Sequence, residues 1–190
     1  HGRRRYNYGV VHEYITMTFK IIDNFLLKNF YQTLSEELKS SKIPWYNKET
    51  DVKNSKKKNN GFFSFCYYNN FQPDHHLFHK HMTPFIKKLN VAALLQVRAN
   101  LVLRDQDTIE SDFHTDYDCM YSTTGIFYLT NCNAKTILKI KNKNVSVNSK
   151  ENRMLLFDSR ISHKVIYQTD VHKRYVINFN FIGNNNGTYS

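Results

Sequence analysis

Two histidines and one aspartate are the residues of this sequence whose types and spacing could hold a redox-active metal ion. His114 and Asp116 are separated by one residue, and His163 lies well downstream of them. Two imidazoles and one carboxylate form the facial triad that binds non-haem ferrous iron and leaves one face of the ion open for a cosubstrate and dioxygen. The pattern therefore predicts oxygen-dependent redox chemistry.

The spacing of these residues requires them to lie on strands. In a strand, residues i and i+2 project to the same face, so His114 and Asp116 can reach one ion while Thr115 points away. The third ligand has to come from a distant strand. The sequence contains strand-like runs before the His114–Asp116 pair, at 99–103, and after it, at 124–129, and a third run at 154–157 precedes His163.

Arg174 is the candidate for binding an anionic cosubstrate. It begins an alternating, strand-like run at 174–181, shortly after His163. A planar guanidinium matches a carboxylate with two parallel hydrogen bonds. The alternatives are a surface arginine without this role and a shift of the role to the adjacent Lys173.

The order of these motifs resembles that of a known family. The stretch 98–182 resembles the catalytic core of the Fe(II)/2-oxoglutarate-dependent oxygenases, and most closely the prolyl-hydroxylase-like branch, which includes small phage-encoded members. The segment 19–26 (FKIIDNFL) is similar to the opening of such phage proteins. The core matches are FHTD at 113–116, IFYL at 126–129, NRMLLF at 152–157, His163, and RYVINF at 174–179.

This resemblance implies a fold and a domain organisation. The expected fold is mainly β with flanking α: a double-stranded β-helix, or jelly roll, with N-terminal helices packed on the sheet. A single oxygenase domain is expected at 17–183, with its catalytic core at about 93–182. Residues 1–16 are expected to be a poorly ordered extension.

The resemblance also implies roles for individual residues. His114, Asp116 and His163 would be the catalytic ligands of Fe(II), and Arg174 and Tyr128 would hold the far carboxylate of 2-oxoglutarate. Dioxygen would be the second cosubstrate, ascorbate could serve as reductant, and succinate and CO2 would be released. Because the related halogenases have a non-ligating residue at the position of Asp116, hydroxylation is favoured over halogenation.

Further polar residues on the neighbouring strands are candidates for contacts with cosubstrate or substrate. Asn100 and Arg104 precede the motif, and Asn178 and Asn180 lie on the last strand, one face of which should line the cavity. His172 is the downstream rival of His163, but it lies in a polar turn too close to Arg174.

A histidine cluster competes as a metal site. Its members are His75, His76, His79 and His81. On a helix, His75 and His79 would share one face at i and i+4. Since only Asp74 is available nearby as a further ligand, an ordinary, partly exposed helical face is the favoured interpretation.

Composition fits one compact domain that can bury a sizeable core, because the sequence has 190 residues and 41% of them are hydrophobic.

No apolar run is long enough for a membrane span and no signal-peptide pattern occurs. A cytoplasmic protein is therefore expected, in the host cytoplasm if phage-encoded. Cys66, Cys119 and Cys132 give an odd count without a C-x-x-C pair, so reduced thiols are expected.

The identity of the substrate remains open at this level. The resemblance favours a protein or peptide substrate, hydroxylated at a prolyl residue. The formal charge of +11 and the basic run at 53–58 suggest the alternative of a nucleic-acid oxygenase, either a dealkylase or a base hydroxylase. However, 19 Lys, 8 Arg and 22 Asn are also what an A+T-rich coding sequence would produce. A metal-binding β-barrel without catalysis is the third possibility, and the oligomeric state is undetermined.

Secondary structure is read from local patterns. A strand is expected at 19–22, then a helix capped by Asp23 or Asn24 and running to Leu38. Polar residues at 47–60 predict a loop, 62–68 predicts a strand, and 73–89 should contain a second helix. From Val91 onward, short strands separated by Asn-rich turns are expected, ending in an unstructured tail at 184–187.

Overall fold

The protein is a β-rich domain with two helices. The structure, a computed structural model, describes residues 19–48, 62–104, 110–119 and 121–184. The predicted extension at 1–16, the basic run at 53–58 and most of the predicted tail lie outside these residues. The elements are β1 (Phe19–Ile22), α1 (Lys28–Lys39), β2 (Tyr46–Lys48), β3 (Phe62–Asn69), β4 (Gln72–Pro73), α2 (Phe78–Lys88), β5 (Val91–Leu103), β6 (Ser122–Tyr128), β7 (Lys135–Ile140), β8 (Lys143–Asn148), β9 (Arg153–Asp158), β10 (His163–Ile166) and β11 (Lys173–Gly183).

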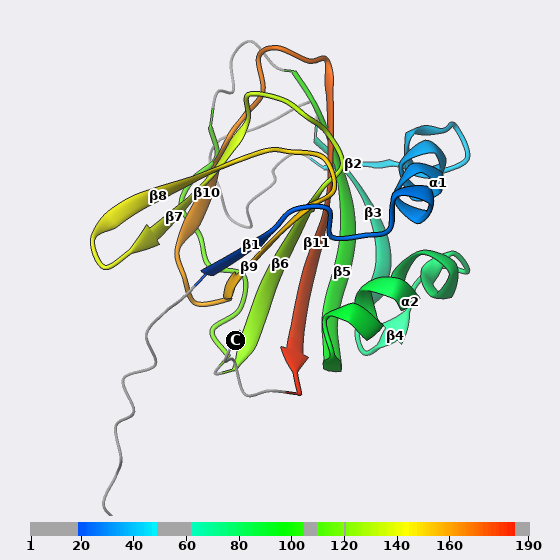
Figure 1. The fold of residues 1–190 in the computed structure, drawn as a ribbon, viewed down its shortest axis with the longest axis horizontal. Coiled ribbons are helices and arrows are strands. Elements are labelled where there is room, and N and C mark those ends of the chain that lie inside the picture. The colour runs from blue at the N-terminus through cyan, green and yellow to red at the C-terminus, as the bar shows by residue number, and fades with distance from the viewer. Residues whose placement is uncertain (1–18, 49–61, 105–109, 120, 185–190) are drawn as a thin grey trace, which may run out of the picture.

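The strands form two antiparallel sheets that enclose the site. The larger sheet has the order β1-β9-β6-β11-β5-β3-β2, with β4 paired to β3, and the smaller has the order β10-β7-β8. The segment that carries His114 extends the smaller sheet, because it forms bridges from Glu110 to Ile166 and from His114 to His163. Figure 1 shows the smaller sheet on one side of the larger sheet and the helices on the other. The predicted jelly roll is confirmed.

The main hydrophobic core lies between the helices and the outer face of the larger sheet. Helix α1 contributes Tyr31, Leu34 and Leu38, and α2 contributes Phe78, Met82 and Phe85. These side chains pack on strand residues that include Phe127, Ile177 and Phe179. The predicted arrangement of N-terminal helices on the sheet is therefore present, and this layer supports the strands that carry the site.

Strand β6 is buried along its whole length because it lies between the two cores. Phe127 faces the helices, whereas Ile126 and Tyr128 face the smaller sheet. Gly125 permits close packing of its neighbours, since a Cβ there would lie 3.2 Å from Leu156 Cδ2 and 3.4 Å from Phe179 Cβ. The strand predicted at 124–129 is present as β6, and its geometry directs every second side chain to the site layer.

Several turns use asparagine in the left-handed region, as the Asn-rich pattern predicts. The β7–β8 hairpin is closed by Lys141 and Asn142, which both have positive φ, 45° and 62°. Two successive residues of this kind form the tight hairpin turn that matches the twist of its strands. Asn90 and Asn152 also have positive φ, and each precedes a strand.

The first helix begins later than the sequence pattern predicts. Asp23 and Asn24 do not cap it; α1 begins at Lys28, after Leu27. Phe25 and Leu26 instead bind Asn152: Phe25 N donates to its backbone carbonyl, and Leu26 exchanges two hydrogen bonds of 2.8 and 2.9 Å with its side chain. Asp23 forms ion pairs with Lys150 and Arg153. These long-range contacts override the local capping signal.

Cys66, Cys119 and Cys132 are free thiols, as predicted. In the described part of the chain, neither helix has the length and apolar character needed to cross a membrane.

Candidate metal centre

His114 and His163 are brought together by the pairing of two chain segments. Each backbone N–H donates to the carbonyl of the other residue, over 3.0 Å from His114 N and 2.8 Å from His163 N. Their rings lie 4.3 Å apart between centroids. Because this bridge fixes both backbones, the two imidazoles point in the same direction from adjacent strands.

Asp116 completes a cluster with the two histidines, although the strand expected at 114–116 is not formed: His114 makes a single β-bridge and Asp116 lies in a bend. Its Oδ1 lies 3.7 Å from His114 Nε2 and 3.7 Å from His163 Nε2. The three ligand atoms lie within 4.8 Å of one another, and no other group of three His, Cys, Asp or Glu residues in the described segments is placed this way. The predicted triad therefore forms one site, with a donor set suited to non-haem iron.

Hydrogen bonds from the other ring nitrogens orient the two histidines. His114 Nδ1 lies 3.2 Å from the Asp112 carbonyl, and His163 Nδ1 lies 3.0 Å from the Ile161 carbonyl. Since a carbonyl only accepts, each Nδ1 carries the proton and donates it. Each Nε2 then presents its lone pair to the centre of the cluster, which is the arrangement that metal-binding histidines require.

Asp116 is oriented through its second oxygen. Oδ2 accepts hydrogen bonds from Thr124 Oγ1 over 2.9 Å and from Asn180 Nδ2 over 2.8 Å. Ser159 lies behind Thr124, at 3.1 Å between the hydroxyl oxygens. Oδ1 therefore remains directed at the two imidazoles, and the carboxylate offers a metal one oxygen.

Burial and charge set the protonation states that metal binding needs. Burial raises the pKa of Asp116, but His163 and the hydrogen bond from Asn180 outweigh it and hold the pKa below its ordinary value. Burial lowers the pKa of His163, although Asp116 opposes this effect. An ionised carboxylate beside a neutral imidazole is the ligating form of both side chains.

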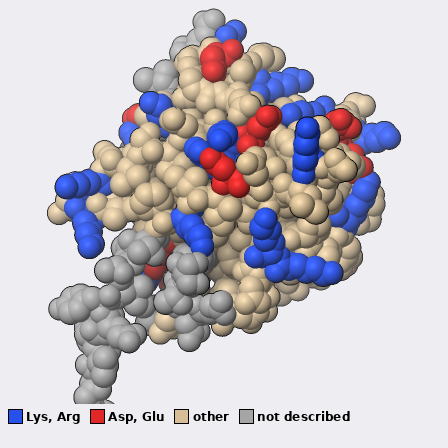
Figure 2. All heavy atoms as spheres, in the orientation of Figure 1, with Lys and Arg blue, Asp and Glu red and all other residues tan. Residues whose placement is uncertain are grey.

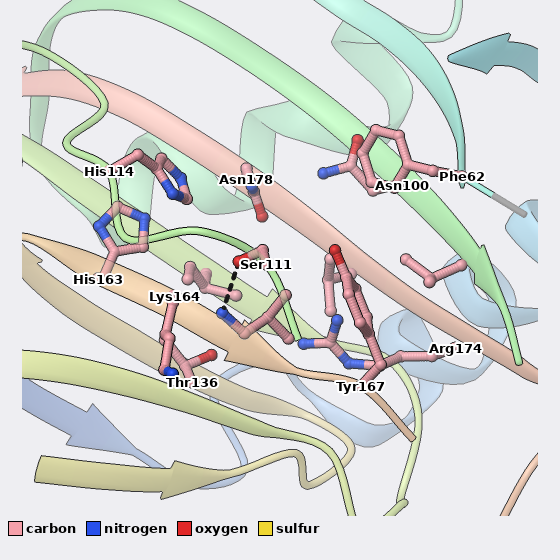
Figure 3. A pocket seen from close by; sticks show the side chains of 14 residues that line it. Phe62, Asn100, Ser111, His114, Thr136, His163, Lys164, Tyr167, Arg174 and Asn178 are labelled. Atoms are coloured by element: carbon pink, nitrogen blue, oxygen red, sulfur yellow. Dashed lines mark hydrogen bonds between the residues drawn. The ribbon is translucent and has the colours of Figure 1, made fainter. Parts of the chain in front are cut away.

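A cavity extends from the two histidines to Arg174. Figure 3 shows the imidazoles at one end, Arg174 and Tyr167 toward the other, and Asn178 between them. Arg174 is only 4% exposed, so it is a buried cation of β11 and not a surface arginine. The cavity is lined by Phe62, Asn100, Val102, Ser111, His114, Ile126, Thr136, His163, Lys164, Val165, Tyr167, Arg174, Val176 and Asn178.

Three polar atoms of this lining are buried without a hydrogen-bond partner in the described chain. They are Asn100 Oδ1, Tyr167 Oη and Asn178 Oδ1. Leaving such an atom unpaired costs about 1–3 kcal/mol, so native proteins rarely tolerate several together. The cavity is therefore suited to a polar ligand that would satisfy these atoms.

Tyr128 lies behind the cavity wall. It is fully buried, and its hydroxyl shares a hydrogen bond of 2.7 Å with Thr136 Oγ1. Thr136 lines the cavity, and the Arg174 guanidinium carbon lies 5.9 Å from the centre of the Tyr128 ring. Burial raises the pKa of Tyr128 to about 12, so its phenol stays protonated.

The structure separates the remaining candidates. Asn100 and Asn178 line the cavity, and Asn180 positions Asp116. Arg104 is exposed and donates to the Thr169 carbonyl, so it lies outside the cavity, and His172 is exposed as well. Lys173 is also exposed, because it alternates with Arg174.

Tyr167 and Thr136 were not identified from the sequence. A signal for Tyr167 was present, because His163, Val165 and Tyr167 are spaced by two and all three line the cavity. Thr136 lies opposite Val165 on the neighbouring strand β7. Its place in the site therefore depends on strand pairing, which the sequence alone did not reveal.

The competing histidine cluster is divided by the fold. Helix α2 begins at Phe78, so His75 precedes it and does not share a helical face with His79. His75 packs on Phe65, while His81 is buried and bound to Tyr67 and Glu37. Of the four histidines, the expected exposed helical face therefore holds for His79; His75 and His76 precede the helix, and His81 is part of a buried hydrogen-bond network.

Known proteins share this fold at low sequence identity. No family model matches the sequence, and no curated protein matches it. A prolyl-4-hydroxylase of Pseudomonas putida has a TM-score of 0.65 at 12% identity, over 88% of this chain and 94% of that chain. A prolyl hydroxylase of Trichoplax adhaerens, in complex with a peptide fragment of the hypoxia inducible factor oxygen degradation domain, has a TM-score of 0.62 at 19% identity, over 87% and 84%.

A third solved structure contains both a metal and the cosubstrate. It is HygX from Streptomyces hygroscopicus with nickel, 2-oxoglutarate and hygromycin B bound, with a TM-score of 0.60 at 9% identity, over 90% of this chain and 84% of that chain. The chain thus has the fold of the 2-oxoglutarate- and Fe(II)-dependent oxygenases. The expectation of this fold, drawn from the order of the motifs, is confirmed.

Proposed function

We propose that the protein is a Fe(II)- and 2-oxoglutarate-dependent dioxygenase that hydroxylates its substrate. One observation carries the proposal: His114 Nε2, His163 Nε2 and Asp116 Oδ1 converge within 4.8 Å, in a fold shared with such enzymes. A structural role alone would not require a carboxylate and two oriented imidazoles to face one point.

The donor set fits ferrous iron. Two imidazoles and one carboxylate oxygen would hold the ion, and the cavity lined by both histidines would leave space for small ligands. When bound, Fe(II) with 2-oxoglutarate and dioxygen would supply the oxidation of a substrate C–H bond, with release of succinate and CO2. The residues of the chain hold and orient these components.

Arg174 is the proposed anchor for the far carboxylate of 2-oxoglutarate. A buried guanidinium at the end of a polar cavity matches a carboxylate, and the bound anion would compensate the buried positive charge. Tyr167 Oη could donate to the same anion, because it is buried in the cavity without a partner among the described residues. Tyr128 remains a candidate through Thr136, whose hydroxyl lines the cavity.

Apolar side chains would exclude water from this end of the site. Val102, Ile126 and Val176 line the cavity between the polar residues. They belong to neighbouring strands of the larger sheet, so their positions are fixed by its hydrogen bonds. A dry wall strengthens the interaction between Arg174 and a bound carboxylate, because charges attract more strongly at low dielectric constant.

A peptidyl residue, most specifically a prolyl residue, is the substrate that we favour. Two of the similar structures are prolyl hydroxylases, and one contains a bound peptide. The nucleic-acid alternative is supported by the net charge of +11. Figure 2 shows the Lys and Arg side chains of one face scattered and mixed with Asp and Glu, not gathered into a track.

The proposed reaction is tested by turnover with a defined metal. Purified protein is loaded anaerobically with Fe(II) and 2-oxoglutarate, and succinate is measured after oxygen is admitted, with and without added peptides or nucleic acids. Mass spectrometry should then detect a product heavier by one oxygen atom. Binding of nucleic acid that weakens steeply with salt would favour the alternative substrate. Absence of 2-oxoglutarate turnover under all conditions would contradict the proposal.

A further inference from the structure

Arg98 lies on β5, on the same side of the strand as two residues that line the cavity. On this strand Asn100 and Val102 line the cavity, and Arg98 continues the same alternation. Arg98 lies opposite Asn178 on β11, and the next pair on the same face of the two strands is Gln96 and Asn180. Since Asn180 binds Asp116, Arg98 and Asn178 lie one step from the side chain that positions the metal ligand.

Both members of this cross-strand pair carry a polar atom without a partner. Arg98 Nε and Asn178 Oδ1 are buried, and neither forms a hydrogen bond with any described residue. One atom is a donor attached to a permanent positive charge, and the other is an acceptor. An unpaired donor and an unpaired acceptor at the same level of two neighbouring strands are costly for the fold alone.

Strand pairing places Arg98 away from Arg174. Arg98 pairs with Asn178 of β11 on one side and with Cys66 of β3 on the other. Val102, four residues along β5, is the residue that pairs with Arg174. Arg98 therefore lies at the level of Asn178, whereas Arg174, where the cosubstrate is proposed to bind, lies at the other end of the cavity.

We propose that Arg98 and Asn178 recognise the substrate by binding the backbone C=O and N–H of a residue that neighbours the one that reacts. This inference rests on the proposed function. In an extended chain, the N–H and C=O of one residue point to the same side. A substrate in that conformation would present its carbonyl oxygen to Arg98 and its N–H to Asn178 Oδ1, which satisfies both buried atoms at once.

The test measures how peptides stimulate turnover. The probe is a positional-scanning library of N-acetylated, C-amidated peptides with a central proline, and the readout is succinate released above the peptide-free level. Wild-type protein should be stimulated by at least one sublibrary. In Arg98→Met, and in Asn178→Val, the apparent KM for that sublibrary should rise about tenfold or more, as expected for loss of a hydrogen bond to a charged or buried group.

Controls separate recognition from stability. Arg104→Met removes an exposed arginine of the same region and should keep the wild-type KM for peptide. Arg98→Lys keeps the charge but loses the planar fork, so an intermediate KM is expected. Because the buried Nε of Arg98 has no partner among the described residues, neither Arg98 variant should melt below the wild type. A clear loss of melting temperature in both would assign Arg98 a structural role and overturn the inference.

The remaining outcomes are distinguishable by titration of 2-oxoglutarate into the anaerobic metal-loaded protein. Arg98→Met could lower the affinity for 2-oxoglutarate by the same factor by which it raises the KM for peptide. That result would place Arg98 in the cosubstrate site and overturn the inference. Wild-type protein that binds 2-oxoglutarate but is stimulated by no sublibrary would overturn the peptide assignment alone. Wild-type protein that binds neither Fe(II) nor 2-oxoglutarate would instead contradict the proposed function.

Discussion

Asn180 donates a hydrogen bond of 2.8 Å to Asp116 Oδ2, across 64 positions of the chain. Asn180 also donates to Thr124 Oγ1, and Thr124 donates to the same carboxylate oxygen. These bonds leave Asp116 Oδ1 directed at His114 and His163. The position of the proposed metal ligand Asp116 is thus determined by two neighbouring strands of the larger sheet, β11 and β6.

Asn180→Ala should weaken metal binding without abolishing it. The substitution removes one of two donors to Asp116 Oδ2, and loss of such an orienting partner typically costs about 10–100-fold in metal affinity. Anaerobic titration with Fe(II), or with Mn(II) as a redox-stable substitute, measures the effect. Asn148→Ala, at an exposed asparagine, is the control. Equal affinities in both variants would show that Thr124 alone positions the carboxylate.

His114→Ala and His163→Ala should each abolish tight metal binding and 2-oxoglutarate turnover. Each removes one of the three side chains that are proposed to bind the same ion. His79→Ala, at an exposed histidine of α2, should retain both properties. Metal content after dialysis and succinate release provide the two measurements. A triad variant that keeps iron and turnover would refute the assignment of the metal centre.

Arg174→Ala should lower the affinity for 2-oxoglutarate by at least about tenfold, which corresponds to about 1.4 kcal/mol, while the affinity for metal changes little. A charge-assisted hydrogen bond to a buried carboxylate contributes about 1.5–3 kcal/mol. Arg174→Lys should show an intermediate loss, because the ammonium lacks the fork of the guanidinium. Isothermal titration of 2-oxoglutarate into anaerobic metal-loaded protein tests this. Lys173→Ala, at an exposed position, is the control; a loss in this variant alone would move the anchor to Lys173.

The two phenols near Arg174 should differ in their roles. Tyr167→Phe removes a buried hydroxyl without a partner in the described chain, so the stability of the protein should stay the same or increase. The same substitution should lower the affinity for 2-oxoglutarate about fivefold. Tyr128→Phe removes the hydrogen bond to Thr136 and should cost about 1 kcal/mol of stability. Thermal melts and cosubstrate titrations separate the two variants. A larger loss of cosubstrate affinity in Tyr128→Phe would restore the role that the family resemblance implies for Tyr128.

Protonation of His81 should destabilise the packing of the helices. Its Nδ1 lies 2.6 Å from the Tyr67 hydroxyl and its Nε2 lies 2.6 Å from Glu37 Oε2. In the neutral ring, Nε2–H donates to Glu37 and Nδ1 accepts from Tyr67, and a second proton removes that acceptor. Burial lowers the pKa of His81 below the ordinary value of a histidine, against the opposing effect of Glu37.

The direction of the pH dependence follows from these shifts. Because the folded pKa of His81 is lowered, its contribution to stability is present above about pH 6.5 and is lost as the pH falls. Lys80 and His81 lower the pKa of Glu37, whose contribution is lost below its ordinary range. The melting temperature should therefore drop from about pH 7.5 to about pH 5.5. The drop should be smaller in His81→Gln and unchanged in His79→Gln; an undiminished drop in His81→Gln would assign it to other groups.

Much of the site was predictable because strand alternation is a local property. The position of Arg174 in an alternating run indicates which side chains of β11 share a face without any knowledge of their partners. At the metal centre, by contrast, His114 forms a single bridge and Asp116 lies in a bend, so their convergence depends on partners from other strands. The same local property placed Asn178 on the face that lines the cavity. The sequence by itself therefore predicted the class of fold, the three side chains that converge and the basic residue proposed as the anchor.

Tertiary structure decided how these faces meet. The bridge between His114 and His163, the contact of Asn180 with Asp116 and the pairing of Arg98 with Asn178 depend on register between strands distant in sequence. Long-range contacts also moved the start of the first helix to Lys28. Register is set by the packing of both sheet faces against their cores, and a one-residue slip would turn each side chain to the opposite face. No local pattern records that choice, so the geometry of the site emerges only when the sheets assemble.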